Sequence, residues 1–233
     1  MSAAPRYAIY FAPSPDAALY RFGAALLGYD AFKPEDIDHP SQALRTFADW
    51  HELTADPRKY GFHATLKAPF LLAGGQTEAS LCNAFDRFAQ MPRELPVIAP
   101  VIRAIGSFSA VVPDAAVAQL SQLADDCVRE FEPFRAPLTD RDRRRRLKSP
   151  LTPRQVEHLD RWGYPYVFEE FRFHMTLTGS LPAAKREAVL SFLQDEFAKL
   201  GLASLTVSHL ALFRQEQSNA RFVVMRHAAL RTA

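Results

Sequence analysis

The sequence predicts an α+β protein built from a duplicated unit, on three observations. The pattern Phe-His-x-Thr-Leu occurs twice, at 62–66 and 173–177, and each copy lies in a segment that alternates like a β-strand. Each copy is followed by an amphipathic helix and then by further strand segments. The copies start 111 residues apart, close to half of the 233-residue chain. We therefore expect one domain of two similar lobes that face each other, with approximate pseudo-repeat halves 1–112 and 113–233.

Apolar periodicity and capping residues predict the elements of the first half. We expect strands at 7–12, 60–72 and 97–112, the last as one or two strands. We expect helices at about 14–28, 42–50 and 77–90. Ser14 followed by proline is typical of a helix start, and Gly28 of a helix end.

The second half repeats the order of a His-Thr strand, a helix and more strand. We expect helices at about 114–131, 152–162 and 182–200, and strands at 167–179, 205–213 and 221–227. Gly163 and Gly201 follow two of these helices as expected for helix ends. Residues 133–150 stand apart, because a proline-rich stretch leads into a strongly basic run.

Strand geometry makes the repeated pattern chemically informative. Side chains alternate between the two faces of a strand, so residues at every second position share a face. The polar faces carry His63, Thr65 and Lys67 in the first copy, and Arg172, His174, Thr176 and Thr178 in the second. The opposite faces are apolar, as expected for a core. If the two polar faces meet, two imidazoles and several hydroxyls surround one small space.

These paired His-x-Thr-hydrophobic strands resemble those of the 2H phosphoesterase superfamily. The longer strings Tyr60–Phe70, Arg161–Val167 and Phe171–Gly179 are similar to its branch encoded alongside phosphonate-utilisation genes, which is DUF1045-like. The resemblance spans most of the chain. It implies a bilobal fold with two antiparallel sheets facing each other around a central cleft. It also implies cleavage of a cyclic phosphate ester without a metal or another cofactor.

The residues themselves suit that chemistry. Opening a cyclic phosphodiester needs a base to activate water and an acid to protonate the leaving oxygen, and two imidazoles can supply one of each. Their mutual repulsion should separate their pKa values, without indicating which is the base. Threonine hydroxyls can donate hydrogen bonds to the phosphate oxygens. The candidate catalytic residues are His63, Thr65, His174 and Thr176, and the candidate substrate-binding residues are Lys67, Arg172 and Thr178.

Three features leave alternatives open. A metal held by the two histidines is the rival chemistry, but no carboxylate shares either strand face near them, so we expect no metal. The basic run Arg141–Lys148 is either a solvated helix face or a flap that attracts a second phosphate. The aromatic residues Trp162, Tyr164 and Tyr166 either form the floor of the cleft or pack in the core.

Composition narrows the function classes. The formal charge of +2 and the absence of a long basic stripe argue against nucleic acid, and no apolar run is long enough for a membrane span. Two cysteines, Cys82 and Cys127, are expected to be buried thiols in a cytoplasmic protein. Oligomeric state is not indicated. We expect a hydrolase that opens a small phosphorylated substrate, a ribose cyclic phosphate if the phosphonate association holds. An RNA-end phosphodiesterase or ligase-like enzyme and a non-catalytic phosphometabolite-binding protein are the alternatives.

Overall fold

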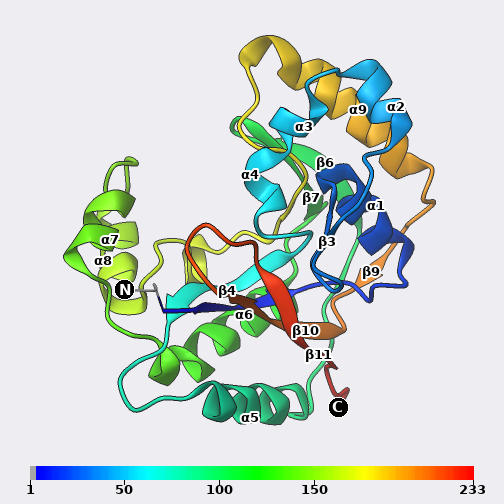
Figure 1. Cartoon of the computed structure of the whole chain (residues 1–233). Coiled ribbons are helices and arrows are strands. Elements are labelled where there is room, and N and C mark those ends of the chain that lie inside the picture. Colours follow the sequence, from blue (N-terminus) through cyan, green and yellow to red (C-terminus); the bar gives the residue numbers. More distant parts are fainter. Residues whose placement is uncertain (1–3) are drawn as a thin grey trace.

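A seven-stranded antiparallel sheet with the strand order β11-β10-β1-β4-β8-β7-β6 organises the computed structural model, which describes residues 4–233 (Figure 1). Its strands are β1 (Arg6–Phe11), β4 (Ala64–Leu71), β6 (Pro100–Ile105), β7 (Phe108–Pro113), β8 (Met175–Thr176), β10 (His209–Gln215) and β11 (Val223–Ala229). Two short pairs lie outside it, formed by β2 (Tyr29–Asp30) with β3 (Glu35–Asp36) and by β5 (Val97–Ile98) with β9 (Leu205–Thr206).

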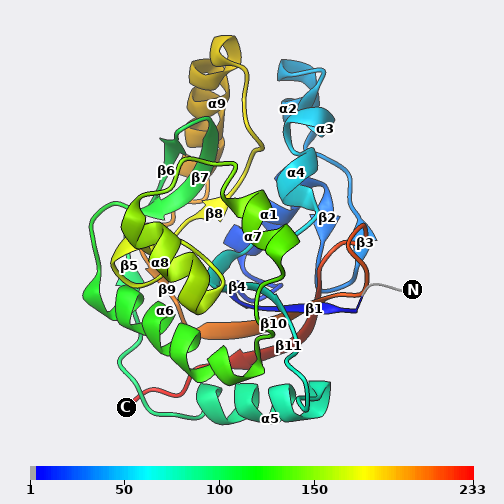
Figure 2. The same ribbon diagram turned by 90° about the vertical axis from the view of Figure 1, so that its left-hand side faces the viewer.

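Helices cover the sheet at both ends. They are α1 (Ala18–Leu27), α2 (Ser41–Thr46), α3 (Trp50–Leu53), α4 (Ala55–Arg58), α5 (Glu78–Ala89), α6 (Ala118–Glu130), α7 (Asp140–Arg146), α8 (Pro153–Trp162) and α9 (Arg186–Ala198). Helix α5 packs on β10 and β11, α6 on β4, and α9 on β6. Figures 1 and 2 show α7 and α8 as a pair that projects beside the middle of the sheet. Among the described residues, no helix has the length and apolar character needed to cross a membrane.

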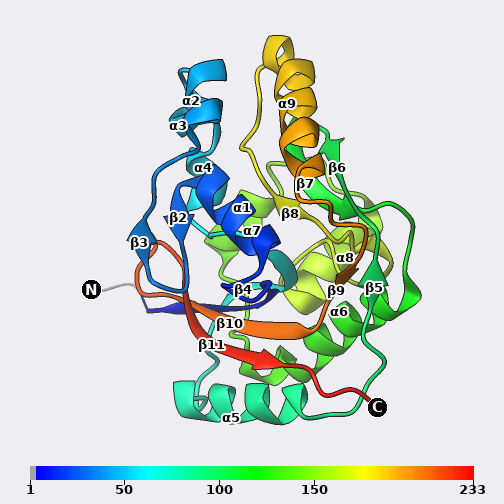
Figure 3. The same cartoon turned by 90° about the vertical axis from the view of Figure 1, so that its right-hand side faces the viewer.

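The expectation of two facing sheets was wrong, because the two His-Thr strands pair directly. Strand β4 lies antiparallel to β8, and this single junction joins the two halves of the sheet into one. Strand β10 also pairs with β1, which places the C-terminal hairpin beside the N-terminal strand (Figure 3). Each side of the junction therefore contains strands from both halves of the sequence.

The second His-Thr strand is much shorter than the expected 167–179. Only Met175–Thr176 belongs to the sheet, and the residues before it form a short 3-10 helix that begins at Phe168 with a φ of 55°. After β8, the N–H groups of Leu177 and Thr178 both donate to the carbonyl of Ser109, so the regular ladder ends. The polar and apolar alternation at 173–177 nevertheless holds, because the segment stays extended around the junction.

Local signals predicted most helix boundaries. Helices α5 and α8 begin with capping boxes at Thr77 and Thr152, and Gly28 ends α1 with a φ of 71°. The expected Ser14 cap does not form, because α1 begins at Ala18 without a side-chain cap. The predicted helix at 42–50 is divided into α2 and α3.

Strand β1 lies inside the sheet and separates two apolar layers. Ile9 belongs to the main core under α5 and α6, whereas Tyr10 belongs to a smaller cluster with Phe213 and Phe222 on the opposite face. Burial of these side chains supplies the main driving force for folding. Both cysteines are buried free thiols, which confirms that expectation. Tyr10 is paired with Thr65, so the face of the sheet that carries Tyr10 also carries the polar side chains of the first His-Thr pattern.

Helix α1 is in close contact with Phe62, the residue before His63. A Cβ atom on Gly23 would lie 2.2–2.4 Å from ring atoms of the fully buried Phe62. Alanine is ordinarily favoured over glycine in a helix by about 1 kcal/mol. Here we expect Gly23→Ala to lower the free energy of unfolding by about 1–3 kcal/mol, because the buried site is overpacked. Urea denaturation measures this.

The matched control is Gly74→Ala, since nothing lies within 4 Å of a Cβ at that position. It should change stability by no more than about 0.5 kcal/mol. A Gly23→Ala variant more stable than the wild type would contradict the packing described here.

Candidate active site

The pairing of β4 with β8 brings the two His-Thr patterns side by side. Ala64 is paired with Met175, and residue numbers in an antiparallel pair run in opposite directions. His63 therefore lies beside Thr176, and Thr65 beside His174, on the same face of the sheet. In this approximately two-fold arrangement the two histidines are diagonal neighbours, a relation that places residues roughly 7–8 Å apart, with a somewhat shorter distance between their Cβ atoms. That separation leaves room for a small group between the rings.

Each histidine is oriented by its own backbone. Nδ1 of His63 lies 2.9 Å from the carbonyl oxygen of Gly61, and Nδ1 of His174 lies 2.8 Å from that of Arg172. Since a carbonyl only accepts hydrogen bonds, each Nδ1 carries the hydrogen and each Nε2 presents a lone pair. The Thr65 hydroxyl is 3.3 Å from Nε2 of His63. Both copies of the pattern thus use the residue two positions earlier to select the same tautomer.

Burial makes both imidazoles weak bases. The ring of His63 stacks on Tyr10 with 3.8 Å between ring centroids, and this desolvation, opposed by the Gly61 hydrogen bond and reinforced by the charge of His174, lowers the pKa of His63 to about 4. Burial also lowers the pKa of His174 from its ordinary value. The unliganded site therefore holds two neutral imidazoles at neutral pH, and His63 is the more strongly shifted.

All four candidate catalytic residues line one cavity of about 640 Å³. Tyr164 and Tyr166 form part of its wall. Four cations also line it: Arg6, Lys59, Arg145 and Arg146. No Asp or Glu is among the described residues around it, so the cavity combines neutral imidazoles and hydroxyls with a positive rim. Such a composition favours an anionic ligand.

The other predicted substrate-binding residues have different surroundings. Arg172 is exposed and lines an adjoining hollow of about 460 Å³, which is mainly apolar and also contacts Thr65 and His174. Thr178 is fully buried, and its hydroxyl oxygen accepts a hydrogen bond of 3.0 Å from the Ser109 N–H. The structure therefore uses Thr178 to hold β7 beside the site.

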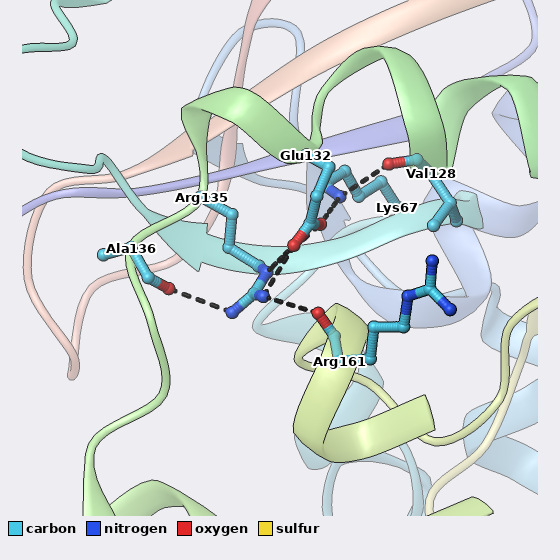
Figure 4. Close-up of polar contacts among 6 residues, drawn as sticks. All are labelled: Lys67, Val128, Glu132, Arg135, Ala136 and Arg161. Atoms are coloured by element: carbon cyan, nitrogen blue, oxygen red, sulfur yellow. Dashed lines mark hydrogen bonds and ion pairs between the residues drawn. The ribbon is translucent and has the colours of Figure 1, made fainter. Parts of the chain in front are cut away.

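Lys67 points away from the cavity, contrary to the prediction. In the pairing of β1 with β4, Tyr10 lies opposite Thr65 but Ile9 lies opposite Lys67, so Leu66 is an extra residue. This β-bulge turns Lys67 to the core face. Its ammonium is buried and donates to the Val128 carbonyl at 3.0 Å and to Glu132 at 2.8 Å (Figure 4).

Arg135 extends this buried network toward the cavity wall. Its guanidinium makes hydrogen bonds of 2.6–3.2 Å with Glu132 and donates to the Arg161 carbonyl near the end of α8 (Figure 4). Gly163 packs against it so closely that a Cβ would lie 2.9 Å from the guanidinium. Because Tyr164 follows directly, the network connects the strand of Thr65 with the wall of the cavity.

Sequence reasoning missed several lining residues. Nothing in the alternation of β1 distinguished Tyr10 from the other buried aromatic residues, and Arg6 and Lys59 had no motif. The sequence marks the basic run Arg141–Lys148 as a whole, and only the structure shows that Arg145 and Arg146 are the members that line the cavity. The three aromatic residues have different positions. Tyr164 and Tyr166 line the cavity, whereas Trp162 does not and instead packs edge-on against Phe168, with ring centroids 5.0 Å apart.

Within residues 4–233, no group of three or more His, Cys, Asp or Glu side chains is placed to hold a metal ion.

Comparisons with known proteins identify relatives of this chain. The family described as "Protein of unknown function (DUF1045)" matches residues 65–223. A protein of Janthinobacterium sp. (strain Marseille) called ribose 1,5-bisphosphate phosphokinase PhnN is 34% identical over 222 residues, which are 94% of this chain and 49% of that protein. A protein of the same name from Laribacter hongkongensis (strain HLHK9) is 34% identical over 225 residues, which are 95% of this chain and 51% of that protein. The chain thus spans about half the length of these curated relatives.

Solved structures give a weaker likeness. The crystal structure of E. coli LigT complexed with 3′-AMP superposes with a TM-score of 0.41 at 12% identity, covering 99% of this chain and 100% of that one. A crystal structure called phosphoesterase gives a TM-score of 0.40 with the same identity and coverage. TM-scores this low do not allow any property of those proteins to be assigned to the present chain.

The buried position of Lys67 makes a prediction about stability. Glu132→Gln would leave the Lys67 ammonium and the Arg135 guanidinium without a carboxylate, and we expect it to cost about 3–5 kcal/mol. Lys67→Met should cost less, because Glu132 keeps Arg135 as a partner. Urea denaturation of both variants compares them. Wild-type stability of Glu132→Gln would show that Lys67 is solvated.

Proposed function

The chain belongs to the DUF1045 family, and we propose that it is a hydrolase that opens a small cyclic phosphodiester. The observation that carries the proposal is the shared cavity, in which two Nε2 lone pairs and two threonine hydroxyls meet under a positive rim. A binding protein needs the cations and hydroxyls. It has no need for two half-buried imidazoles that are both held in the same tautomer.

In the proposed reaction, one histidine takes a proton from water as the oxygen attacks phosphorus. The bond from phosphorus to one ring oxygen breaks, and the other histidine, protonated beforehand, gives its proton to that oxygen. The products are a phosphate monoester and a free hydroxyl on the same molecule. Thr65 and Thr176 donate hydrogen bonds to the non-bridging oxygens, where negative charge increases in the transition state.

The different surroundings of the two rings support an assignment of roles. His63, with the lower pKa, is the base, because it stays neutral over the wider pH range. His174 is the acid, and the negative charge of bound substrate raises its pKa and favours its protonated form. Separated pKa values of two neighbouring groups are typical of an acid–base pair.

The substrate class comes from the relatives. Their name specifies a ribose that carries two phosphates, and the branch resemblance associates the family with phosphonate metabolism. We propose a ribose cyclic phosphate as the substrate of this chain. The phosphokinase activity in the relatives' name is not part of the proposal, since the chain covers only about half of those proteins.

The decisive assay is a panel of cyclic phosphates, namely ribose 1,2-cyclic and nucleoside 2′,3′- and 3′,5′-cyclic phosphates, each with EDTA present. We expect turnover of at least one. His63→Ala and His174→Ala should each lower kcat by about 10²–10⁴-fold, because each removes a proton-transfer group. His209→Ala is the control, since His209 is a half-buried histidine that does not line the cavity. Near-full activity of both motif variants, or loss of activity on chelation, would refute the mechanism.

The role assignment predicts the pH dependence. In the free enzyme His63 must be neutral, which holds above its pKa of about 4. His174 must be protonated, and because burial lowers the pKa of His174 from its ordinary value of 6.5, this proton is lost as the pH rises through a value below 6.5. We expect kcat/KM to be bell-shaped with both limbs on the acid side of pH 6.5. The basic limb of kcat should lie at higher pH than that of kcat/KM, because bound anion favours the imidazolium. A kcat/KM that rises steadily to pH 9 would contradict the assignment.

A further inference from the structure

The positive rim of the cavity carries a second inference, which rests on the proposed function. We propose that Arg145 and Arg146 of α7, with Arg6 and Lys59, form a binding site for a phosphate monoester on the same substrate that carries the cyclic phosphate. The site would make the preferred substrate a doubly phosphorylated molecule. Its two anions would occupy different parts of one cavity, one at the histidines and one at the rim.

The cations at the rim are held in place by other residues. Arg146 lies over the ring of Tyr164, with 5.0 Å between the guanidinium carbon and the ring centroid. Arg6 donates to the side chain of Gln215 at 2.7 Å and lies 5.5 Å from the Phe222 ring centroid. These neighbours are uncharged, so neither guanidinium is neutralised by the group that positions it. A dianion is the partner that such cations lack.

The short helix α7 is positioned so that only some of its arginines reach the cavity. Arg143 forms two hydrogen bonds of 2.6 and 2.9 Å with Asp160 of α8, which ties the helices together. The hydroxyl of Thr139 caps the first turn of α7 by accepting from the Asp142 N–H. With this anchor, Arg145 and Arg146 line the cavity, whereas Arg141 and Arg144 are not among its lining residues.

The cavity also has the capacity for two anionic groups. Its volume of about 640 Å³ is well within the range of small-molecule sites. The histidines and threonines supply one set of partners for phosphate oxygens, and the rim supplies an independent set. Two of the four cations already have an ion pair within their own helix or turn: Lys59 with Asp56 at 3.0 Å and Arg145 with Asp142 at 3.1 Å. Arg145 and Arg146 are the residues to vary, because they are adjacent on α7 and the same helix supplies a control pair of arginines that do not line the cavity.

The matched pair of variants is Arg145→Gln with Arg146→Gln, and Arg141→Gln with Arg144→Gln. Both remove two positive charges from α7, so long-range attraction falls similarly in both, while only the first removes lining residues. The substrates are ribose 1,2-cyclic phosphate with and without a 5-phosphate. We expect the wild type to prefer the 5-phosphorylated form by at least tenfold in kcat/KM. The first variant should lose most of this preference, chiefly through KM, and the second should keep it.

Binding of ribose 5-phosphate, measured by calorimetry, tests the rim without turnover. We expect the wild type and the Arg141/Arg144 variant to bind it with similar affinity, and the Arg145/Arg146 variant at least tenfold more weakly. Equal binding by all three proteins, or equal kcat/KM for the two cyclic substrates in the wild type, would overturn the inference while leaving the hydrolase proposal standing. Failure to hydrolyse either substrate, with the binding difference intact, would instead count against the proposed function alone.

Discussion

The structure depends on one backbone pairing, between Ala64 of β4 and Met175 of β8. This junction joins the four strands on one side of the sheet to the three on the other. Its register also decides which side chains are neighbours, because a shift by one residue would move each histidine and threonine to the opposite face. One short antiparallel contact therefore determines both the continuity of the sheet and the composition of the cavity.

The bulge at Leu66 adds a second constraint close to the first. By turning Lys67 into the core, it exchanges a cation at the cavity for a buried ion pair with Glu132. Arg135 then shares the same carboxylate and holds the end of α8, from which Tyr164 enters the cavity wall. The position of the wall is thus tied to the strand that carries Thr65 through charged groups that are themselves largely buried.

Burial and backbone geometry explain why the two histidines suit proton transfer in the proposed reaction. In each ring Nδ1 is hydrogen-bonded to a backbone carbonyl, so Nε2 is the nitrogen that can exchange a proton with a substrate. Desolvation lowers both pKa values, more strongly for His63, which is stacked on Tyr10. The asymmetry between two copies of one pattern comes from neighbours far away in the sequence, since Tyr10 belongs to β1.

By itself, the sequence determined the α+β class, most helix boundaries and the four residues of the His-Thr pairs, because these depend on local signals: apolar periodicity, capping residues and the two-residue period of a strand. Only the tertiary structure decided that the pairs lie on adjacent strands of one sheet, that Lys67 faces the core and that Arg145 and Arg146 reach the cavity. Those outcomes depend on strand register, on a bulge and on the Arg143–Asp160 ion pair. Each of them joins residues distant along the chain, and local periodicity contains no information about such pairings.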